Sequence, residues 1–412
     1  MKPPVTKLQQ PPFPLPSYVL QALNTICSAG YEAYLAGGCV RDLLLGRIPD
    51  DYDITTGATP QQVMALFDVV VPTGLAFGGV TVVLPGGIIE VTTYRSEAGY
   101  SDGRHPDAIY RASSLVEDVA RRDFTVNALC YHPKTGVVDY INGMQDLKNG
   151  IIRAVGDAQK RFDEDVLRVM RAVRFSAQLG FTVEEETLTA LRSSAYRLVQ
   201  VSAERRQKEL YKLLLSLCPH KLELLRGSGA LPALLGCEPL QAVSFLPLDK
   251  TQPIPAQRYG ALAILCGIDV LAWAKLLKFS NRLRRAVSSS VTVFTALNNK
   301  SDAVWLKNMM AAQGIEAVSN ALAIASVLWQ ERDALKQLQM LMQRILQNQE
   351  PYRIADLALG GRQLAAWGVP PSRRGQVLEH LRQAVVDNAA ANTSKNLEKL
   401  ALKYLDENKI LL

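Results

Sequence analysis

Apolar and polar positions follow two different patterns along the chain, and the change falls near residue 155. Before it, short apolar runs rich in β-branched residues are bounded by glycine and proline turns, which is typical of strands. Strands are predicted for residues 31–36, 69–71, 79–84 and 88–94, and a helix for the VRDLLLG segment after the first of them. This first third therefore predicts a small α/β unit.

After residue 155, apolar residues recur at helical spacing and β-branched runs are few. Helices are predicted for residues 162–179, 184–193, 203–217 and 320–347. The stretch 218–257 is richer in proline and glycine and predicts a domain transition, and a second break is expected near Glu350-Pro351. The last two-thirds of the chain should be almost entirely helical.

Length and charge set broad limits on the protein. A chain of 412 residues exceeds what one compact core usually holds, so two or more structural units are expected. The net charge of +7 suits a polyanionic partner, although solubility alone explains such an excess equally well. Prolines near the N-terminus do not suit a signal peptide, and the apolar runs are too short to cross a bilayer. We therefore expect a cytoplasmic protein with no membrane partner.

Cysteine and histidine do not indicate a metal centre. None of the six cysteines forms a C-x-x-C pair, which favours free thiols in a reducing compartment. The four histidines lack metal-ligand spacing, so neither a zinc site nor a histidine-aspartate phosphohydrolase site is expected.

The segment LAGGCVRDLLLGRIPDDYDITT contains the residues that most clearly indicate a ligand-binding site. Gly37 and Gly38 lie between a predicted strand and a predicted helix, where glycine lets the backbone approach a ligand closely. The helix N-terminus presents free N–H groups to an anion, and Arg41 in the first turn can reach the same phosphate. Taken alone, the Gly-Gly pair fits an ordinary turn as well.

Asp51 and Asp53 predict a metal site. Side chains two apart on a strand share a face, and two carboxylates held that close repel each other unless a cation lies between them. Oxygen ligands point to Mg²⁺, and two metals would bind a triphosphate and activate an attacking hydroxyl. Glu90, on an apolar strand, is the candidate third carboxylate. The alternatives are a solvated acidic turn and an edge-strand glutamate facing water.

Three ordered motifs, GGCVRDLLLG…DDYD, RRDFTVNAL and EDVLRVMRAVRF, closely resemble those of bacterial class II tRNA nucleotidyltransferases. These are the CCA-adding enzymes, relatives of bacterial poly(A) polymerases. The resemblance implies an α+β fold, in which a head with a mixed sheet, like that of DNA polymerase beta, precedes all-helical neck, body and tail domains. The domains would span residues 1–148, 149–217, 218–310 and 311–412.

The resemblance also implies residue roles in the head. Asp51 and Asp53 would hold Mg²⁺, and Gly38 and Arg41 would contact the nucleoside triphosphate. RRDFTVNA looks like the ribose-reading motif of the family, so Arg122 and Asp123 would contact the nucleotide and its 2′-hydroxyl. The alternative for that stretch is a strand preceded by a charged helix end.

EDVLR resembles the family motif that acts as an amino-acid template for the incoming base. Asp165 and Arg168 are three residues apart, so on a helix they would share a face. Aspartate only accepts hydrogen bonds and arginine only donates them. Cytosine and adenine each present an amine donor beside a ring-nitrogen acceptor, whereas guanine and uracil present the reverse. One Asp–Arg pair therefore matches C and A, and a mismatch costs ~1–3 kcal/mol for each unpaired group.

Arg171 and Arg174 continue this stripe in steps of three and match nucleotide contacts of the family. A surface salt-bridge stripe is the alternative, but apolar residues fill the other faces of the helix and predict its burial. VSAERRQKELYKLLL resembles the neck motif, in which Glu204 and Arg205 would brace the template helix.

Two further features concern the RNA substrate. The segment TYRSEAGYSDGRHPDAI resembles the flexible loop of full CCA-adding enzymes, including Asp102, Arg104 and Pro106; it argues against a CC-only enzyme and leaves an A-only enzyme open. Lysines and arginines would contact RNA phosphates, with a solvated surface as the alternative. The candidates are Arg282, Arg284, Arg285, Arg373, Arg374, Lys395, Lys399 and Lys403.

The sequence thus predicts a CCA-adding enzyme that joins CTP, CTP and ATP in turn to a tRNA 3′ end, releases pyrophosphate, and uses neither a nucleic-acid template nor DNA. The rivals are an A-adding or CC-adding tRNA enzyme, a poly(A) polymerase, and a non-catalytic RNA-binding protein on the same fold.

Overall fold

The computed structural model describes residues 5–6, 13–75, 78–98, 108–297, 302–329 and 332–409. The chain divides into two compact units, Met1–Pro239 and Leu240–Leu412. The boundary lies within the stretch where the sequence predicts a domain transition. Asp102, Arg104 and Pro106 of the predicted flexible loop lie outside the described residues.

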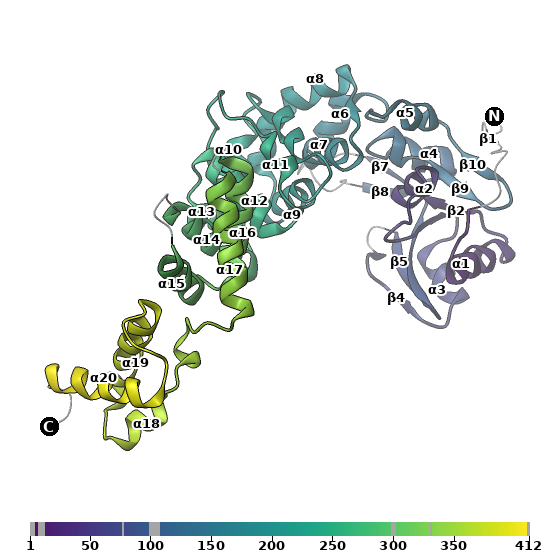
Figure 1. Ribbon diagram of the computed structural model, residues 1–412. Helices are drawn as coiled ribbons and strands as arrows, with labels where there is room; N and C mark the ends of the chain where they lie inside the picture. The colour runs from purple at the N-terminus through teal and green to yellow at the C-terminus, as the bar shows by residue number, and fades with distance from the viewer. Residues whose placement is uncertain are drawn as a thin grey trace. The chain divides into compact units, whose positions relative to one another are not determined.

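The first unit is built on a mixed sheet, which has eight strands in the described part of the chain, in the order β1-β10-β9-β2-β3-β6-β5-β4 (Figure 1). Its strands are β1 (Val5–Thr6), β2 (Ala33–Ala36), β3 (Asp53–Thr56), β4 (Val70–Val71), β5 (Gly79–Leu84), β6 (Gly87–Thr93), β9 (Cys130–His132) and β10 (Gly136–Val138). The predicted strands are confirmed with small shifts of their ends. Neighbours are antiparallel except β3 and β6, whose parallel register places Asp53 beside Glu90.

Short helices and two small sheets complete the part of the first unit around this sheet. The helices are α1 (Ser17–Ser28), α2 (Gly38–Leu44), α3 (Pro60–Leu66), α4 (Leu115–Ala120), the 3-10 helix η2 (Thr125–Asn127) and α5 (Gly143–Asn149). The small sheets pair β7 (Arg95–Ala98) with β8 (Ala108–Arg111), antiparallel, and β11 (Ile151–Ile152) with β12 (Thr182–Val183), parallel. Helix α2 confirms the helix predicted after the first strand.

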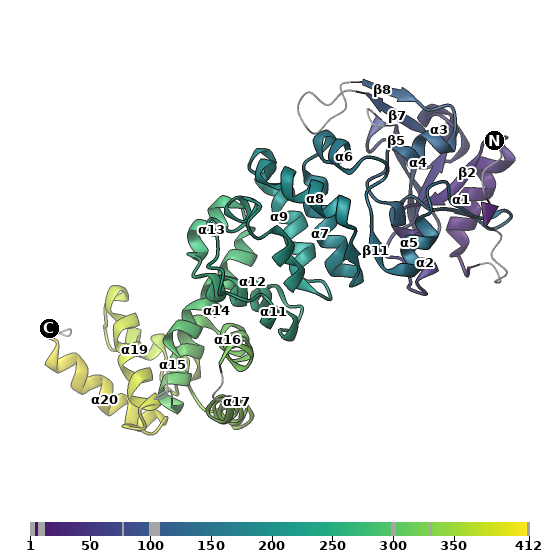
Figure 2. The same ribbon diagram turned by 90° about the horizontal axis from the view of Figure 1, so that it is seen from above.

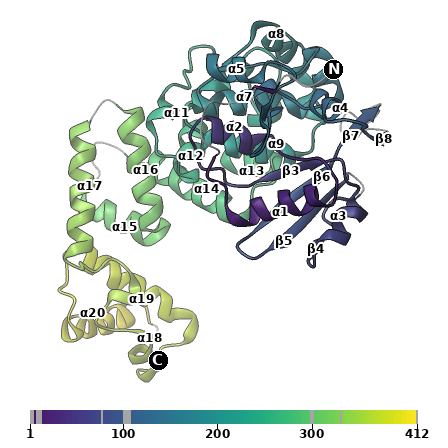
Figure 3. The same cartoon turned by 90° about the vertical axis from the view of Figure 1, so that its right-hand side faces the viewer.

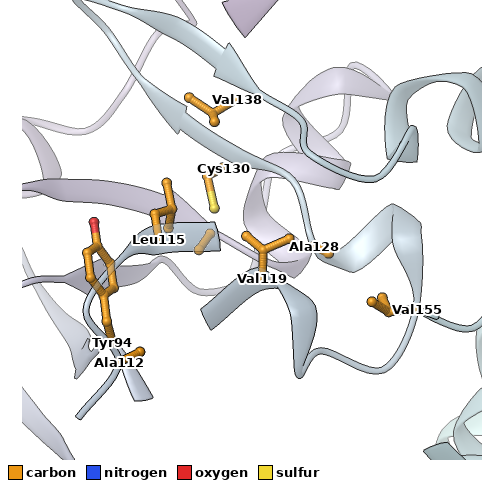
Figure 4. Close-up of a cluster of buried hydrophobic side chains, with 9 residues drawn as sticks. Tyr94, Ala112, Leu115, Val119, Ala128, Cys130, Val138 and Val155 are labelled. Carbon is orange, nitrogen blue, oxygen red and sulfur yellow. The ribbon is translucent and has the colours of Figure 1, made fainter. Parts of the chain in front are cut away.

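A buried apolar cluster fixes the segment that carries the RRDFTVNA motif. Val119 of α4 and Ala128 after η2 are fully buried in it, together with Cys130 of β9. Figure 4 shows these side chains converging with those of Tyr94, Ala112, Leu115, Val138 and Val155. Because the residues on both sides of the motif are held in one core, the polar side chains between them have defined positions.

The remainder of the first unit is helical. Its elements are α6 (Ala158–Glu164), α7 (Leu167–Leu179), α8 (Glu185–Ser194), η3 (Ala195–Gln200), α9 (Ala203–Leu214), η4 (Pro219–Leu225) and α10 (Leu231–Leu235). In Figure 2, α6, α7, α8 and α9 form one group, in which α7 packs on α9 and α6 packs on α8.

The prediction of one continuous helix over residues 162–179 is wrong, because the chain breaks at Asp165. This residue is extended, with φ −147°, and its side chain accepts a 3.0 Å hydrogen bond from the Leu167 amide. Its carbonyl accepts a hydrogen bond from the amide of Arg168 at 2.9 Å. Aspartate is favoured at such a position because it satisfies free N–H groups at the start of a helix. Asp165 and Arg168 therefore do not share a face of one helix: Asp165 precedes α7, and Arg168 lies in its first turn.

The regular secondary-structure elements among the described residues of the second unit are all helices. They are α11 (Pro247–Lys250), α12 (Pro255–Cys266), α13 (Val270–Leu276), α14 (Asn281–Ala296), α15 (Ala303–Gln313), α16 (Ile315–Leu328), α17 (Arg332–Gln347), η5 (Ile354–Asp356), α18 (Gly361–Ala366), α19 (Pro371–Val386) and α20 (Ser394–Glu407). The helix predicted for residues 320–347 is two helices, α16 and α17, because the chain turns extended at Trp329. Figure 3 shows these two helices side by side.

Among the described residues, no single helix is both long and apolar enough to cross a membrane. One bent pair, Pro255–Cys266 with Val270–Leu276, reaches the required length and composition only when its two helices are taken together.

Candidate active site

A single cleft in the first unit collects the twelve residues predicted from the sequence to take part in catalysis or to bind the nucleotide or metal. Its volume is about 770 Å³, and residues from the β2–α2 turn, β3, β6, the α4–η2 segment, α7 and α9 line it. The twelve predicted residues are Gly37, Gly38, Arg41, Asp51, Asp53, Glu90, Arg122, Asp123, Asp165, Arg168, Arg171 and Arg174. Segments that are more than 100 residues apart in sequence therefore face one space.

The glycine turn before α2 brings the backbone close to the arginines of the cleft. Gly37 has φ +81°, a conformation that side-chain-bearing residues rarely adopt, and a Cβ atom there would lie 3.2 Å from Nη1 of Arg122. Gly38 begins α2 without a positive φ. Arg41, one turn into α2, is 9% exposed and donates from Nη1 to Oδ1 of Asn127 at 2.7 Å. The conformational requirement for glycine therefore rests on Gly37.

Three carboxylates form the acidic end of the cleft. Asp53 begins β3, exposed Asp51 precedes it, and Glu90 lies beside Asp53 in the sheet register. Burial, followed by the charges of Asp51 and Glu90, raises the pKa of Asp53 to about 6, while Arg122 acts in the opposite direction. Glu90 is exposed, but β6 lies between β3 and β5, so it is not an edge-strand residue. Asp51 and Glu90 are therefore both close enough to Asp53 to repel its negative charge.

The donor chemistry of this acidic end fits a divalent metal. Asp51 and Asp53 offer oxygen ligands only, and Mg²⁺ is typically held by one or two carboxylates together with substrate phosphates and water. In the described part of the chain, no group of three or more histidine, cysteine, aspartate or glutamate residues is arranged to hold a metal by itself. A metal at this pair would therefore take its remaining ligands from water or from a bound triphosphate.

Arg122 and Asp123 of the RRDFTVNA motif have different surroundings. Arg122 donates from Nη1 to the carbonyl of Asn127 at 3.3 Å, and its buried Nε has no hydrogen-bond partner among the described residues. Asp123 accepts from Nε of Arg171 at 2.7 Å and from the Phe124 amide at 2.8 Å. Burial raises the pKa of Asp123, but Arg171 holds it below its usual range. The Asp123 carboxylate thus holds Arg171 in place. Its contact with a 2′-hydroxyl stays a prediction.

Phe175 organises the arginines of the cleft, a role that sequence reasoning missed. The guanidinium carbons of Arg41, Arg171 and Arg174 lie 5.4, 5.3 and 4.1 Å from the centre of its ring. Burial, together with the charges of Arg171 and Arg41, lowers the pKa of Arg174 to about 10, while Glu209 acts in the opposite direction. The negative face of an aromatic ring attracts cations, so one ring helps to hold three like charges together. In the sequence, Phe175 was read only as a residue that buries the helix.

The two residues of the predicted base reader are each held by ion pairs. Asp165 Oδ2 accepts from Nη2 of Arg205 at 2.8 Å, so Arg205 of the neck motif contacts the residue that precedes the template helix. The bracing role expected for Glu204 stays a prediction. Arg168 Nη1 donates to the carbonyl of Arg161 at 3.0 Å and pairs with Glu164. Both side chains line the cleft. Glu164 directly precedes Asp165 in the EDVLR motif. The sequence did not show that Glu164 pairs with Arg168 while Asp165 contacts Arg205.

Family models match most of the chain. The model of the Poly A polymerase head domain covers residues 33–153. The model described as the probable RNA and SrmB-binding site of polymerase A covers residues 180–242, and that of tRNA nucleotidyltransferase domain 2 covers residues 257–401. The first of these contains the acidic end of the cleft and the RRDFTVNA motif.

Known proteins with similar sequences match nearly the full chain. The CCA-adding enzyme of Limosilactobacillus fermentum is 37% identical over 397 residues, covering 93% of this chain and 96% of that protein. The CCA-adding enzyme of Lactobacillus helveticus is 35% identical over 408 residues, covering 95% and 98%.

Solved structures show the same architecture. The Bacillus stearothermophilus CCA-adding enzyme in complex with CTP has a TM-score of 0.81 and 27% identity, with 95% of this chain and 98% of that chain covered. The Thermotoga maritima CCA-adding enzyme complexed with tRNA has a TM-score of 0.66 at 20% identity, covering 95% and 96%, and shows the fold alone.

The raised pKa of Asp53 predicts competition between protons and a divalent metal. Because this pKa is about 6, the carboxylate takes up a proton as the pH falls through that value, and a metal must displace it. We expect the affinity for Mn²⁺, measured by titration calorimetry, to be constant well above pH 6 and to fall up to about tenfold per pH unit below it. Affinity that stays flat across pH 6 would contradict the assignment.

The same shift has a consequence for stability. A folded-state pKa above the ordinary value of 3.8 means that charged Asp53 destabilises the metal-free fold at neutral pH. This cost decreases as the pH falls below about 6 and is absent below 3.8. Asp53→Asn should therefore raise the melting temperature at neutral pH without metal and weaken the binding of Mn²⁺ above pH 6. The control is Asp68→Asn, an exposed aspartate that does not line the cleft, which should change neither.

Proposed function

The chain belongs to the family of CCA-adding enzymes, and from that membership we propose that it joins CTP, CTP and ATP to the 3′ end of tRNA and releases pyrophosphate. It is a nucleotidyltransferase that acts without a nucleic-acid template. The observation that carries the proposal is the composition of one cleft, which combines paired carboxylates, a group of arginines and an Asp–Arg pair of opposite hydrogen-bonding character.

The acidic end supports phosphoryl transfer from the nucleotide to the RNA. Enzymes of this family use a divalent metal, and we propose that Asp51 and Asp53 hold it and that it is Mg²⁺. When bound, such an ion supplies charge neutralisation for the phosphates and lowers the pKa of the attacking 3′-hydroxyl. Glu90 adds negative charge beside Asp53 and is the proposed third catalytic carboxylate.

The arginines support binding of the triphosphate and ribose. We assign Arg41, Arg122, Arg171 and Arg174 to the nucleotide, with the backbone of Gly37 and Gly38 approaching the phosphates. Guanidinium groups suit phosphate because their donors match its oxygens in pairs. The carboxylates and the ring that hold these arginines fix them before the nucleotide arrives, which reduces the entropy lost on binding.

Asp165 and Arg168 support the choice of base. A carboxylate has about four lone-pair sites, and the Leu167 amide and Arg205 occupy two of those on Asp165. The remaining sites can accept an exocyclic amine, which cytosine and adenine carry and uracil lacks at the same position. Arg168 supplies donors for the ring-nitrogen acceptor beside that amine. The pair would discriminate by protein hydrogen bonds alone.

We further propose the organisation implied by the family: head (1–148), neck (149–217), body (218–310) and tail (311–412). In the second unit, Lys395, Lys399 and Lys403 are exposed on α20 and Arg282, Arg284 and Arg285 are exposed on α14, which suits contact with RNA phosphates. A cytoplasmic location stays a prediction from the sequence.

The function is tested with purified protein and tRNA transcripts that lack CCA, CA or A, given CTP and ATP separately. We expect CTP to extend the first transcript by two nucleotides and the second by one, and ATP to extend only the third. Failure with CTP would indicate an A-adding enzyme and failure with ATP a CC-adding enzyme. Long A-tails would indicate a poly(A) polymerase.

Asp165→Asn should relax base choice. The amide replaces an acceptor with a donor, so the match to cytosine is lost and the mismatch to uracil is partly relieved. We expect the ratio of kcat/KM for CTP over UTP to fall by about 10- to 100-fold, measured on a transcript lacking CCA.

Asp163→Asn provides the matched control for this change. Asp163 lies two residues earlier, pairs with Arg197 and does not line the cleft, so its loss should leave base choice unchanged. An equal effect of both substitutions, or no effect of Asp165→Asn on the ratio, would refute the role of Asp165 in base choice.

A further inference from the structure

Asp118, a buried carboxylate in α4, lies outside all of the motifs that carry the family resemblance. It is 0% exposed and does not line the cleft. Its Oδ1 accepts from Nη2 of Arg121 at 2.7 Å and from the backbone amide of Arg95 at 3.4 Å. Its Oδ2 accepts from Oγ1 of Thr55 at 3.1 Å and from Nη2 of Arg122 at 3.2 Å. One carboxylate thus joins α4 to β3, to β7 and to two arginines.

The bonds of Asp118 are those of an ionised group. Burial raises its pKa, but Arg121 and Arg122 hold the pKa below its usual range. A buried carboxylate that accepts from charged donors on both oxygens fixes their orientation, and its removal leaves guanidinium charge without compensation. Arg121 and Arg122 have side chains only 17% and 19% exposed, so water compensates them only in part.

The partners of Asp118 are the residues that face the substrate. Arg122 lines the cleft, and its charge acts on Asp53. Thr55 lies two residues after Asp53 on the same strand and also lines the cleft. The position of Arg122 relative to the acidic end is therefore set by a side chain that touches both the strand of Asp53 and the guanidinium itself.

We propose that Asp118 is a positioning residue that holds Arg122 against the triphosphate and ribose of the bound nucleotide, and so sets the affinity for nucleoside triphosphates without touching them. The inference rests on the proposed function. Arg122 lies away from the base-reading pair in sequence and on a different element, so Asp118 acts on the part of the substrate that CTP and ATP share. Loss of the Asp118 carboxylate therefore lowers the affinity for CTP and for ATP by the same factor and leaves base choice intact.

The test is Asp118→Asn, which keeps the shape of the side chain and removes its charge. We expect KM for CTP and for ATP to rise by at least about tenfold each, as for loss of a hydrogen bond to a charged group. The KM for tRNA and the ratio of CTP to UTP use should stay within about threefold of the parent values. Unchanged nucleotide KM values would overturn the proposal, whatever the variant's melting temperature.

Glu184→Gln is the matched control. Glu184 pairs with Arg153 and caps the start of α8 in the same unit, but it does not line the cleft. It should lower stability without changing nucleotide KM. A rise in KM equal to that of Asp118→Asn would show a general effect of lost ion pairs and would also overturn the proposal.

A double-mutant cycle with Arg122→Met keeps the test decisive if Asp118→Asn folds poorly, because the double variant removes one of the charges left unpaired. If Asp118 acts through Arg122, adding Asp118→Asn to Arg122→Met should change the calorimetric Kd for CTP by less than about threefold. If the Kd for CTP of the double variant instead rises by the product of the two single-variant effects, Asp118 does not act through Arg122. Wild-type incorporation on tRNA tests the proposed function separately, since CTP binding is measured here without RNA.

Discussion

Repulsion among guanidinium groups is the constraint on which the site depends. Several arginines line one cleft of the first unit, among them the four assigned to the nucleotide, and in a partly buried space the charges of these four would drive them apart. Each has a carboxylate beside it: Arg41 with Asp42, Arg122 with Asp118, Arg171 with Asp123, and Arg174 with Glu209. Phe175 supplies the negative face of a ring to three of them. The cleft thus presents positive charge that is already ordered, as binding of a triphosphate requires.

At the acidic end of the cleft, the like charges that lie close together are negative. Parallel pairing of β3 with β6 places Asp53 beside Glu90, and Asp51 adds a third carboxylate near them. Both ends carry a cost in the free protein, and the proposed ligand, a nucleoside triphosphate with a divalent metal, would relieve both. Destabilised charges of this kind are typical of functional sites rather than of structural ion pairs.

Strand and helix periodicity, which are local signals, predicted the head and the helical remainder. The spacing of Gly37, Asp51 and Asp53 indicated one part of the cleft, and the resemblance of the motifs to a known family supplied most of its other members. Prediction from the sequence failed where a single side chain alters the backbone conformation. At Asp165 the periodicity continues, yet the carboxylate accepts from the Leu167 amide at the start of α7 and the chain is extended there, so the helix is broken. Long-range partners were also beyond it: the bond between Asp118 and Thr55 joins residues 63 apart in sequence, and no spacing rule connects them.

In the proposed function, the protein cleft recognises the nucleotide and reads its base with no nucleic acid present. Calorimetric titration of CTP, ATP, GTP and UTP into the protein without RNA is the decisive measurement. Binding of CTP and ATP at least about tenfold tighter than GTP and UTP is the result predicted, from the cost of unpaired polar groups at Asp165 and Arg168. Equal affinity for all four nucleotides would contradict it.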